Sequence, residues 1–172
     1  MSESWETAFL AMFDRWVARY RSRDKDWQKY ASVEDEALLS STGYRAQELF
    51  DYVEDHVNYG EPDPGTILNI AVVRREYFQE VQHGVPSRRQ TNPSELPAKG
   101  DAIEGIPWLP RLIVKAECKL RGELHPDVMY CCPGDWAFFD LHGLDPVEFL
   151  RFVWECDGDR EAIVRHVVAA GK

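Results

Sequence analysis

Apolar residues spaced three and four apart constrain the fold of this chain more than any other feature. The first such stripe consists of seven large residues near the N-terminus: Trp5, Phe9, Met12, Phe13, Trp16, Val17 and Tyr20. In an α-helix this spacing places all seven on one side. The stripe predicts a helix from about Ser4 to Arg21 that buries these residues in a core and does not form a cofactor site.

Helix start and stop signals divide most of the remaining chain into further helices. Ser32 and Asp35 stand in the relation of a capping box, and Pro64 and Pro146 each follow an aspartate at an N-cap position. Glycines at 84, 122 and 143 are typical helix stops. We therefore expect a short helix after Ser32 and further helices over 42–58, 64–82, 109–120, 134–141, 146–156 and from Asp159 onward.

The region 85–106 is rich in proline and has little periodicity, so it is predicted to be a long loop. It would join an N-terminal and a C-terminal helical half. A brief strand is considered only for residues 127–131. The predicted fold is all-α: a single compact multi-helix domain over residues 1–172, with a long central loop and no sheet of three or more strands.

Charge is distributed unevenly along the 172 residues, whose net charge is −10. The segment 33–64 holds nine acidic residues and one basic residue, Arg45. A field of this sign repels the phosphate backbone, so we expect no nucleic-acid partner. We also expect no membrane partner, because no apolar run approaches the roughly 20 residues of a membrane span.

The first residues, MSESWETAF, lack the basic and apolar regions of a secretory signal. The four cysteines, Cys118, Cys131, Cys132 and Cys156, do not form the dense pattern of a disulfide framework. These two observations predict a cytoplasmic protein without structural disulfides.

The second half of the chain resembles a bacterial protein family. The residues that carry the resemblance are Trp108-Leu109-Pro110-Arg111, Lys115, Gly122-Glu123-Leu124, Cys132-Pro133-Gly134-Asp135, Phe139 and Gly143. In this W-L-P-R, K, G-E-L and C-P-x-D pattern, residues 106–153 are similar to the domain of unknown function numbered five thousand and sixty-nine. The resemblance implies a helical fold and brings no established activity.

Two kinds of side chain in this region suggest a binding site. Arg111, Lys115 and Lys119 are spaced to line one side of a helix, where Arg111 could grip a carboxylate or phosphate with two hydrogen bonds. Trp108 and Tyr130 would supply apolar walls. The alternative is that the cations lie on a solvated face or pair with the acidic segment.

Cys132 and Asp135 are the candidate catalytic pair. Cys132 precedes an expected helix start, where the helix dipole favours a negatively charged sulfur, and His125 could act as a base. The alternative is an inert buried cysteine and an aspartate that caps the helix. A zinc site formed by Cys118, His125, Cys131 and Cys132 lacks the usual ligand spacing, so we expect no metal and no cofactor.

The sequence therefore supports two functions of different class. The first is the binding of an anionic small molecule by Trp108, Arg111, Lys115 and Tyr130, with or without catalysis by Cys132 and Asp135. The second is a non-catalytic protein–protein interaction module that uses the acidic segment 33–64. The oligomeric state has no signature in the sequence.

Overall fold

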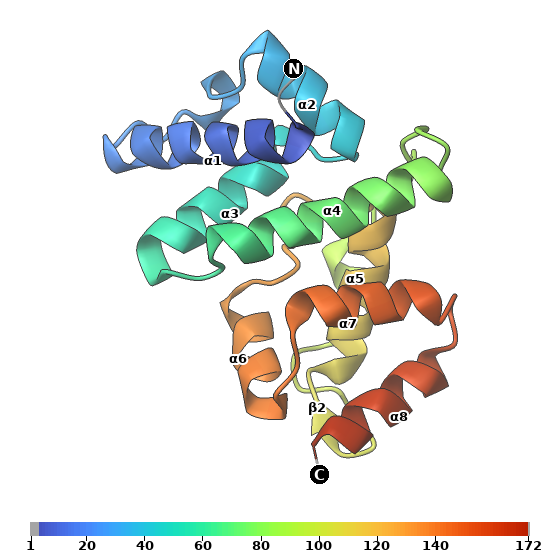
Figure 1. Cartoon of the computed structure of the whole chain (residues 1–172). Coiled ribbons are helices and arrows are strands. Elements are labelled where there is room, and N and C mark those ends of the chain that lie inside the picture. Colours follow the sequence, from blue (N-terminus) through green and yellow to red (C-terminus); the bar gives the residue numbers. More distant parts are fainter. Residues whose placement is uncertain (1–3, 172) are drawn as a thin grey trace. The chain divides into compact units, whose positions relative to one another are not determined.

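A computed structural model describes residues 4–171 of the chain (Figure 1). Within these residues lie eight α-helices, two short 3-10 turns and one two-stranded antiparallel sheet. The chain is mostly helical, as predicted, and no sheet of three strands occurs in this part of it. Contacts divide the chain into two compact units, residues 1–85 and 86–172, and the boundary falls where the predicted central loop begins.

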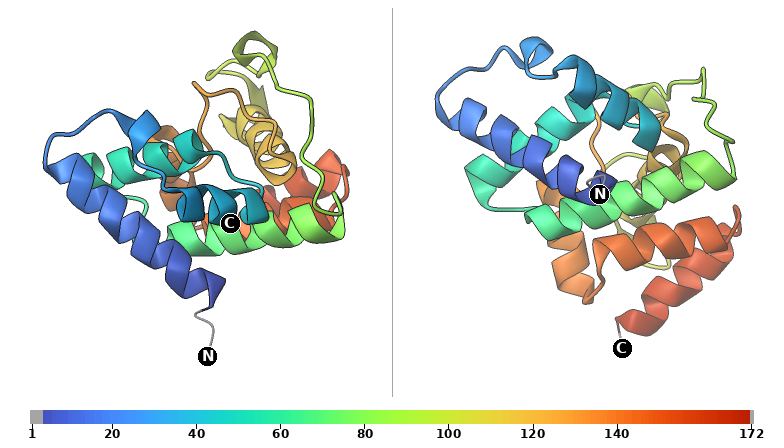
Figure 2. Two further views of the ribbon diagram at one scale, coloured as in Figure 1. Left: turned by 90° about the horizontal axis from the view of Figure 1, so that it is seen from above. Right: turned by 45° about the horizontal axis from the view of Figure 1, so that its top comes forward.

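The first unit contains α1 (Trp5–Arg21), η1 (Trp27–Lys29), α2 (Val33–Thr42), α3 (Ala46–Tyr59) and α4 (Pro64–Glu80). Helix α1 packs against α2, α3 and α4, which Figure 2 shows from two directions. The predicted stripe of α1 is buried from Phe9 to Tyr20. Ser32 and Asp35 form the predicted capping box of α2, and Asp63 caps α4 with Pro64 in its first turn.

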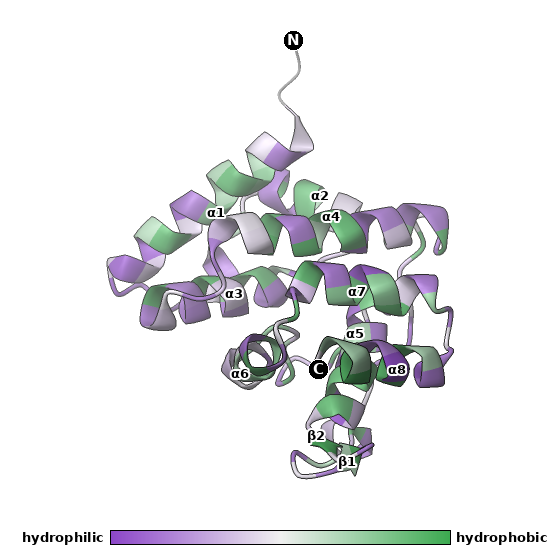
Figure 3. Ribbon diagram, turned by 60° about the horizontal axis from the view of Figure 1, so that its bottom comes forward, coloured by the Kyte–Doolittle hydropathy of each residue, from purple (hydrophilic) through white to green (hydrophobic). Residues whose placement is uncertain are grey.

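The second unit contains η2 (Pro93–Glu95), β1 (Ala102–Ile103), β2 (Ile106–Pro107), α5 (Leu109–Arg121), α6 (Pro133–His142), α7 (Pro146–Glu155) and α8 (Arg160–Ala170). Helix α5 packs against α7, α8 and β1. It buries Leu109, Leu112, Ile113, Ala116 and Leu120, and hydrophobic and hydrophilic residues alternate along it in Figure 3. The stops at Gly122 and Gly143 are confirmed, because both glycines cap their helices in the left-handed region.

Three predictions of local structure differ from the structure: the start of one helix, the long loop and the brief strand. The helix expected from Thr42 begins at Ala46, because α2 continues to Thr42 and ends at Gly43 with φ of 72°. Residues with a Cβ atom rarely adopt this φ, and a Cβ atom at Gly43 would also lie 2.6 Å from Nη2 of Arg74. The expected loop 85–106 contains η2 and most of the β1–β2 hairpin, while residues 127–131 form no strand.

No helix within residues 4–171 is both long enough and apolar enough to span a membrane. All four cysteines are unpaired.

Candidate functional site

The carboxylate of Asp135 is the centre of the polar cluster that α5 and α6 form. Its side chain is fully buried and accepts hydrogen bonds on both oxygens. Trp108 Nε1 donates to Oδ1 at 2.9 Å, and Lys115 Nζ donates to Oδ2 at 2.5 Å. The backbone N–H groups of Cys131 and Cys132 also donate to Oδ2, at 2.8 and 3.4 Å. One buried carboxylate therefore joins the start of α5, the middle of α5 and the turn before α6.

Lys115 is as deeply buried as its partner, with 3% of its side chain exposed. Removing two charges from water is costly, and the attraction between them compensates only when hydrogen bonds satisfy the remaining atoms. The indole and the two backbone N–H groups satisfy the carboxylate here. The Lys115–Asp135 pair therefore stabilises the site only as a complete set, and loss of one charge would leave the other buried without compensation.

The backbone at this cluster adopts two conformations that side chains disfavour. Trp108 has φ of 71° and Cys131 has φ of 69°, both in the left-handed region. For residues other than glycine this conformation costs free energy, and it persists only where the surroundings compensate. Each of these residues donates a hydrogen bond to Asp135, so the buried carboxylate stabilises both strained turns.

Gly134 allows the Trp108 ring to lie against the first turn of α6. A Cβ atom at position 134 would lie 2.6 Å from one carbon of that ring and 2.7 Å from another. The absence of a side chain is thus a steric requirement of the contact. The glycine of the C-P-x-D turn and the tryptophan of the W-L-P-R segment are complementary in shape.

Cys132 is the candidate nucleophile, and its sulfur has an ammonium group nearby. Cys132 is the N-cap of α6, and Lys115 Nζ lies 3.3 Å from its Sγ. The predicted base, His125, forms no hydrogen bond to this sulfur: its Nδ1 accepts from the backbone N–H of Asp127 and lies 3.6 Å from the carboxylate of Asp127. Burial raises the pKa of the thiols of Cys118 and Cys156, and raises that of Cys131 well above its ordinary value.

The other predicted site residues divide between the cluster and its surroundings. Arg111 Nη1 donates to the carbonyl oxygen of Pro97 at 2.8 Å, outside the Asp135 cluster. Tyr130 is a core residue whose hydroxyl donates to the carbonyl oxygen of Pro146, and burial raises its pKa well above the ordinary value. Lys119 is buried as well, with 1% of its surface exposed. The structure therefore brings Trp108, Lys115, Cys132 and Asp135 together, and Arg111 and Tyr130 make their hydrogen bonds elsewhere.

A hollow of about 320 Å³ lies beside the cluster, and the sequence did not indicate it. Trp108 forms part of its wall, and Leu141, with 79% of its surface exposed, stands at its edge. The full lining comes from the hairpin side and from α6: Gly105, Ile106, Pro107, Trp108, Gly134, Ala137, Phe138, Leu141 and His142. We refer to this space as the Trp108 hollow. Nearly all of its lining is apolar, and an apolar concave surface of this kind is typical of small-molecule sites.

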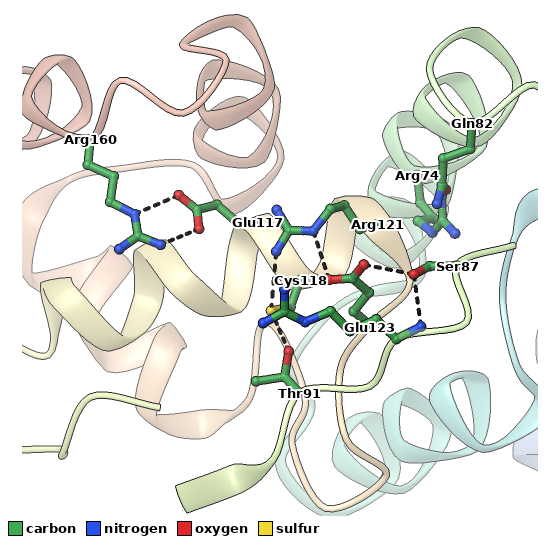
Figure 4. A network of polar contacts seen from close by, with 10 residues as sticks. Arg74, Gln82, Ser87, Thr91, Glu117, Cys118, Arg121, Glu123 and Arg160 are labelled. Atoms are coloured by element: carbon green, nitrogen blue, oxygen red, sulfur yellow. Dashed lines mark hydrogen bonds and ion pairs between the residues drawn. The ribbon is translucent and has the colours of Figure 1, made fainter. Parts of the chain in front are cut away.

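The C-terminal end of α5 carries a second polar network, which Figure 4 shows. Glu123 accepts from the hydroxyl of Ser87 and from Nε of Arg121, both at 2.8 Å. Thr91 donates its backbone N–H to the carbonyl of Glu123, and its hydroxyl lies 3.1 Å from the sulfur of Cys118. These contacts hold residues 87–91 of the predicted loop against α5. Periodicity could not reveal them, because they join an irregular segment to a helix end.

The acidic segment 33–64 uses several of its carboxylates within the first unit. Asp35 binds Arg15, Glu48 accepts from the backbone N–H of Arg45 at the start of α3, Glu54 accepts from the hydroxyl of Tyr20, and Asp63 caps α4. Glu34, Glu36 and Glu61 are exposed. The interaction module remains a prediction, with fewer carboxylates available to a partner than the sequence suggested.

Among residues 4–171, no group of three or more His, Cys, Asp and Glu side chains is placed to hold a metal ion. The cluster at Asp135 is instead a closed ion pair beside an apolar hollow. No family model, no curated protein and no solved structure matches the chain, so the resemblance of its second half to a known family stays a prediction.

Proposed function

We propose that the second unit binds a small organic anion with an apolar body and catalyses no reaction on it. The observation that carries the proposal is the Trp108 hollow, an apolar concave surface of about 320 Å³. An apolar body would lie against Trp108 and Phe138, and burial of its surface would supply most of the binding free energy.

The wall of this hollow is held in place before any ligand arrives. The Trp108 indole donates to a buried carboxylate and its ring contacts Gly134 closely, so two constraints fix its orientation. A ligand that meets a fixed wall loses less affinity to the ordering of protein side chains. On this proposal, the buried Lys115–Asp135 pair positions Trp108 and does not contact the ligand.

Arg111 is the candidate for the anionic group. Of the two cations in the predicted site, Lys115 is paired with Asp135, whereas Arg111 donates to a neutral carbonyl and has no carboxylate of residues 4–171 within ion-pair distance. It lies in the first turn of α5, whose N-cap is Trp108, and outside the lining of the Trp108 hollow, so the anionic group would extend from the hollow toward it. A guanidinium can bind a carboxylate, sulfonate or phosphate through two parallel hydrogen bonds.

Binding is favoured over catalysis by the state of the two candidate catalytic residues. Asp135 accepts four hydrogen bonds in a fully buried position, which leaves it poorly placed to take a proton from a substrate. Cys132 has an ammonium group near its sulfur and no hydrogen bond to the histidine that could act as its base. Nucleophilic catalysis requires such a base within reach, or its equivalent.

The proposal can be tested with 8-anilinonaphthalene-1-sulfonate, a fluorescent anion with an aromatic body. We expect one molecule to bind per chain by fluorescence and calorimetry. Ala137→Trp, which fills the Trp108 hollow from an exposed position, should weaken binding about tenfold or more. Arg111→Gln should weaken it by a factor of about 10 to 100, the equivalent of a charge-assisted hydrogen bond of about 1.5–3 kcal/mol.

Two controls separate the hollow from general surface binding. N-phenyl-1-naphthylamine has the same rings without the sulfonate, so its affinity should respond to Ala137→Trp and not to Arg111→Gln. Ala169→Trp places the same bulky residue on α8, outside the Trp108 hollow, and should leave both affinities unchanged. Equal binding of the sulfonate to the wild-type protein and to folded Ala137→Trp would refute the proposal.

A further inference from the structure

A second hollow, of about 520 Å³, lies between the β1–β2 hairpin and α8. Its floor is apolar and is formed by Ile103, Val164, Val168 and Ala169. Ile103 is 38% exposed, whereas Val164 is almost completely buried. We refer to this space as the α8 hollow. Its volume is within the range of small-molecule sites, and none of its lining residues belongs to the Trp108 hollow.

Both cations at the rim of the α8 hollow already lie near carboxylates. Arg160 donates to the two oxygens of Glu117 at 2.9 and 2.6 Å, an arrangement visible in Figure 4. The guanidinium of Arg165 lies 3.9 Å from Asp159 and 3.7 Å from Glu161. An anionic ligand would have to compete with these acids for each guanidinium.

Glu104 differs from the other charged groups at the rim. It is exposed in the hairpin turn, and its carboxylate forms no ion pair with any residue in 4–171. The charged residues that line the hollow are two acids and two bases, Glu104, Glu161, Arg160 and Arg165. Both guanidinium groups lie near carboxylates, so Glu104 is the charged lining residue that stays without an ion pair among residues 4–171. An unpaired carboxylate above an apolar floor is complementary to a cation that carries an apolar tail.

We propose that the α8 hollow binds an amphipathic organic cation, an amine whose apolar tail lies on the valine floor and whose ammonium group pairs with Glu104. The charge that remains at the rim selects the amine over a carboxylate with the same tail, because the carboxylate would face unpaired like charge. This site is separate from the Trp108 hollow and does not depend on the ligand proposed there.

Titration calorimetry with octylammonium, octanoate and octanol tests the proposal, because the three probes share one tail. We expect octylammonium to bind at one molecule per chain and octanoate to bind at least about tenfold more weakly. Ala169→Trp, which fills the hollow, should abolish octylammonium binding, while Ala137→Trp should leave it unchanged. Added salt should weaken the amine and not the alcohol.

Glu104→Gln tests the electrostatic part at an exposed position where the fold is not at risk. It should weaken octylammonium by a factor of about 2 to 5, consistent with an exposed ion pair. Asp140→Asn changes the net charge equally at an exposed position of α6 and should have no such effect. The proposal is overturned if octanoate binds as tightly as octylammonium, or if the two charge variants weaken the amine equally.

Discussion

Asp35 in the first unit and Asp135 in the second occupy the same local position. Each is the third residue of its helix, α2 or α6, and each closes a capping box with the residue three positions earlier. Each carboxylate also accepts from a tryptophan indole: Trp16 at 3.4 Å and Trp108 at 2.9 Å. The chain therefore uses one local arrangement, a helix-start aspartate bound to an indole, in both units.

The two positions differ in the cation that completes them. Asp35 binds Arg15, whose side chain is 59% exposed, and Asp135 binds Lys115, whose side chain is 3% exposed. Both contacts measure 2.5 Å, so distance does not distinguish them. Water can replace Arg15 if that pair breaks and cannot easily replace Lys115. Loss of the carboxylate should therefore destabilise the protein more at Asp135 than at Asp35, because the cation at Asp135 is buried and the cation at Asp35 is exposed.

The largest expected effect is at Asp135. Asp135→Ala should lower the free energy of unfolding by about 3–5 kcal/mol, because it leaves Lys115 charged and buried without a partner. Denaturant unfolding measures this value. The double variant with Asp135→Asn and Lys115→Met should be more stable than Asp135→Asn alone, since it removes both charges. A double variant that is less stable than Asp135→Asn would contradict this account of the pair.

A substitution at Gly134 tests how much of the stability lost in Asp135→Ala depends on the placement of the Trp108 ring. Gly134→Ala should cost about 1–3 kcal/mol of unfolding free energy, because the new Cβ atom overlaps the indole ring. It should also weaken binding of 8-anilinonaphthalene-1-sulfonate. Gly100→Ala is the matched control, since nothing lies within 4 Å of a Cβ atom at that position. If both variants unfold at the same denaturant concentration, the Trp108–Gly134 contact does not constrain the site.

The effect at Asp35 should be smaller than that at Asp135. Asp35→Ala should cost about 1–2 kcal/mol, the value of a lost helix cap and a long indole hydrogen bond, with little from the exposed arginine. Arg15→Ala should change unfolding by at most about 1 kcal/mol. Thermal and denaturant unfolding of both variants check this order. A loss at Asp35 that equals the loss at Asp135 would show that burial of the cation does not decide the difference.

Asp55 is a third helix carboxylate and lacks the donors that the other two have. One of its oxygens is buried without a hydrogen bond among residues 4–171, and burial, with a contribution from Glu54, raises its pKa to about 6. Because the folded state holds this proton more tightly than the unfolded state, stability should fall as the pH rises from about 4 to about 6. Solvent screens the half-buried group, so the change should be about 1 kcal/mol.

Asp55→Asn should remove this fall, which unfolding measured at pH 4, 5, 6 and 7 would show. Asp140→Asn on the exposed face of α6 should leave the pH dependence unchanged. The same slope in the wild type and in Asp55→Asn would assign the pH dependence to other groups.

Helix boundaries were predictable wherever a local rule determines them. The capping box of Ser32 and Asp35, the proline in the first turn of α4 and the glycine that ends α5 are properties of a few consecutive residues. The start of α3 was missed although the same local rule applies there: Gly43 ends α2 in the left-handed region, as Gly122 ends α5. A hairpin of two-residue strands shows too little alternation to be detected.

The sequence by itself determined that this protein is helical and where most of its helices start and stop, and it predicted a site between the W-L-P-R and C-P-x-D segments. Only the tertiary structure decided what their residues do. It placed Lys115 and Asp135 in a buried pair, directed Arg111 to the carbonyl of Pro97 and opened a hollow beside Trp108. Helix caps depend on contacts over three or four residues, whereas the burial of a charge and the shape of a hollow depend on segments that meet only after the chain has folded.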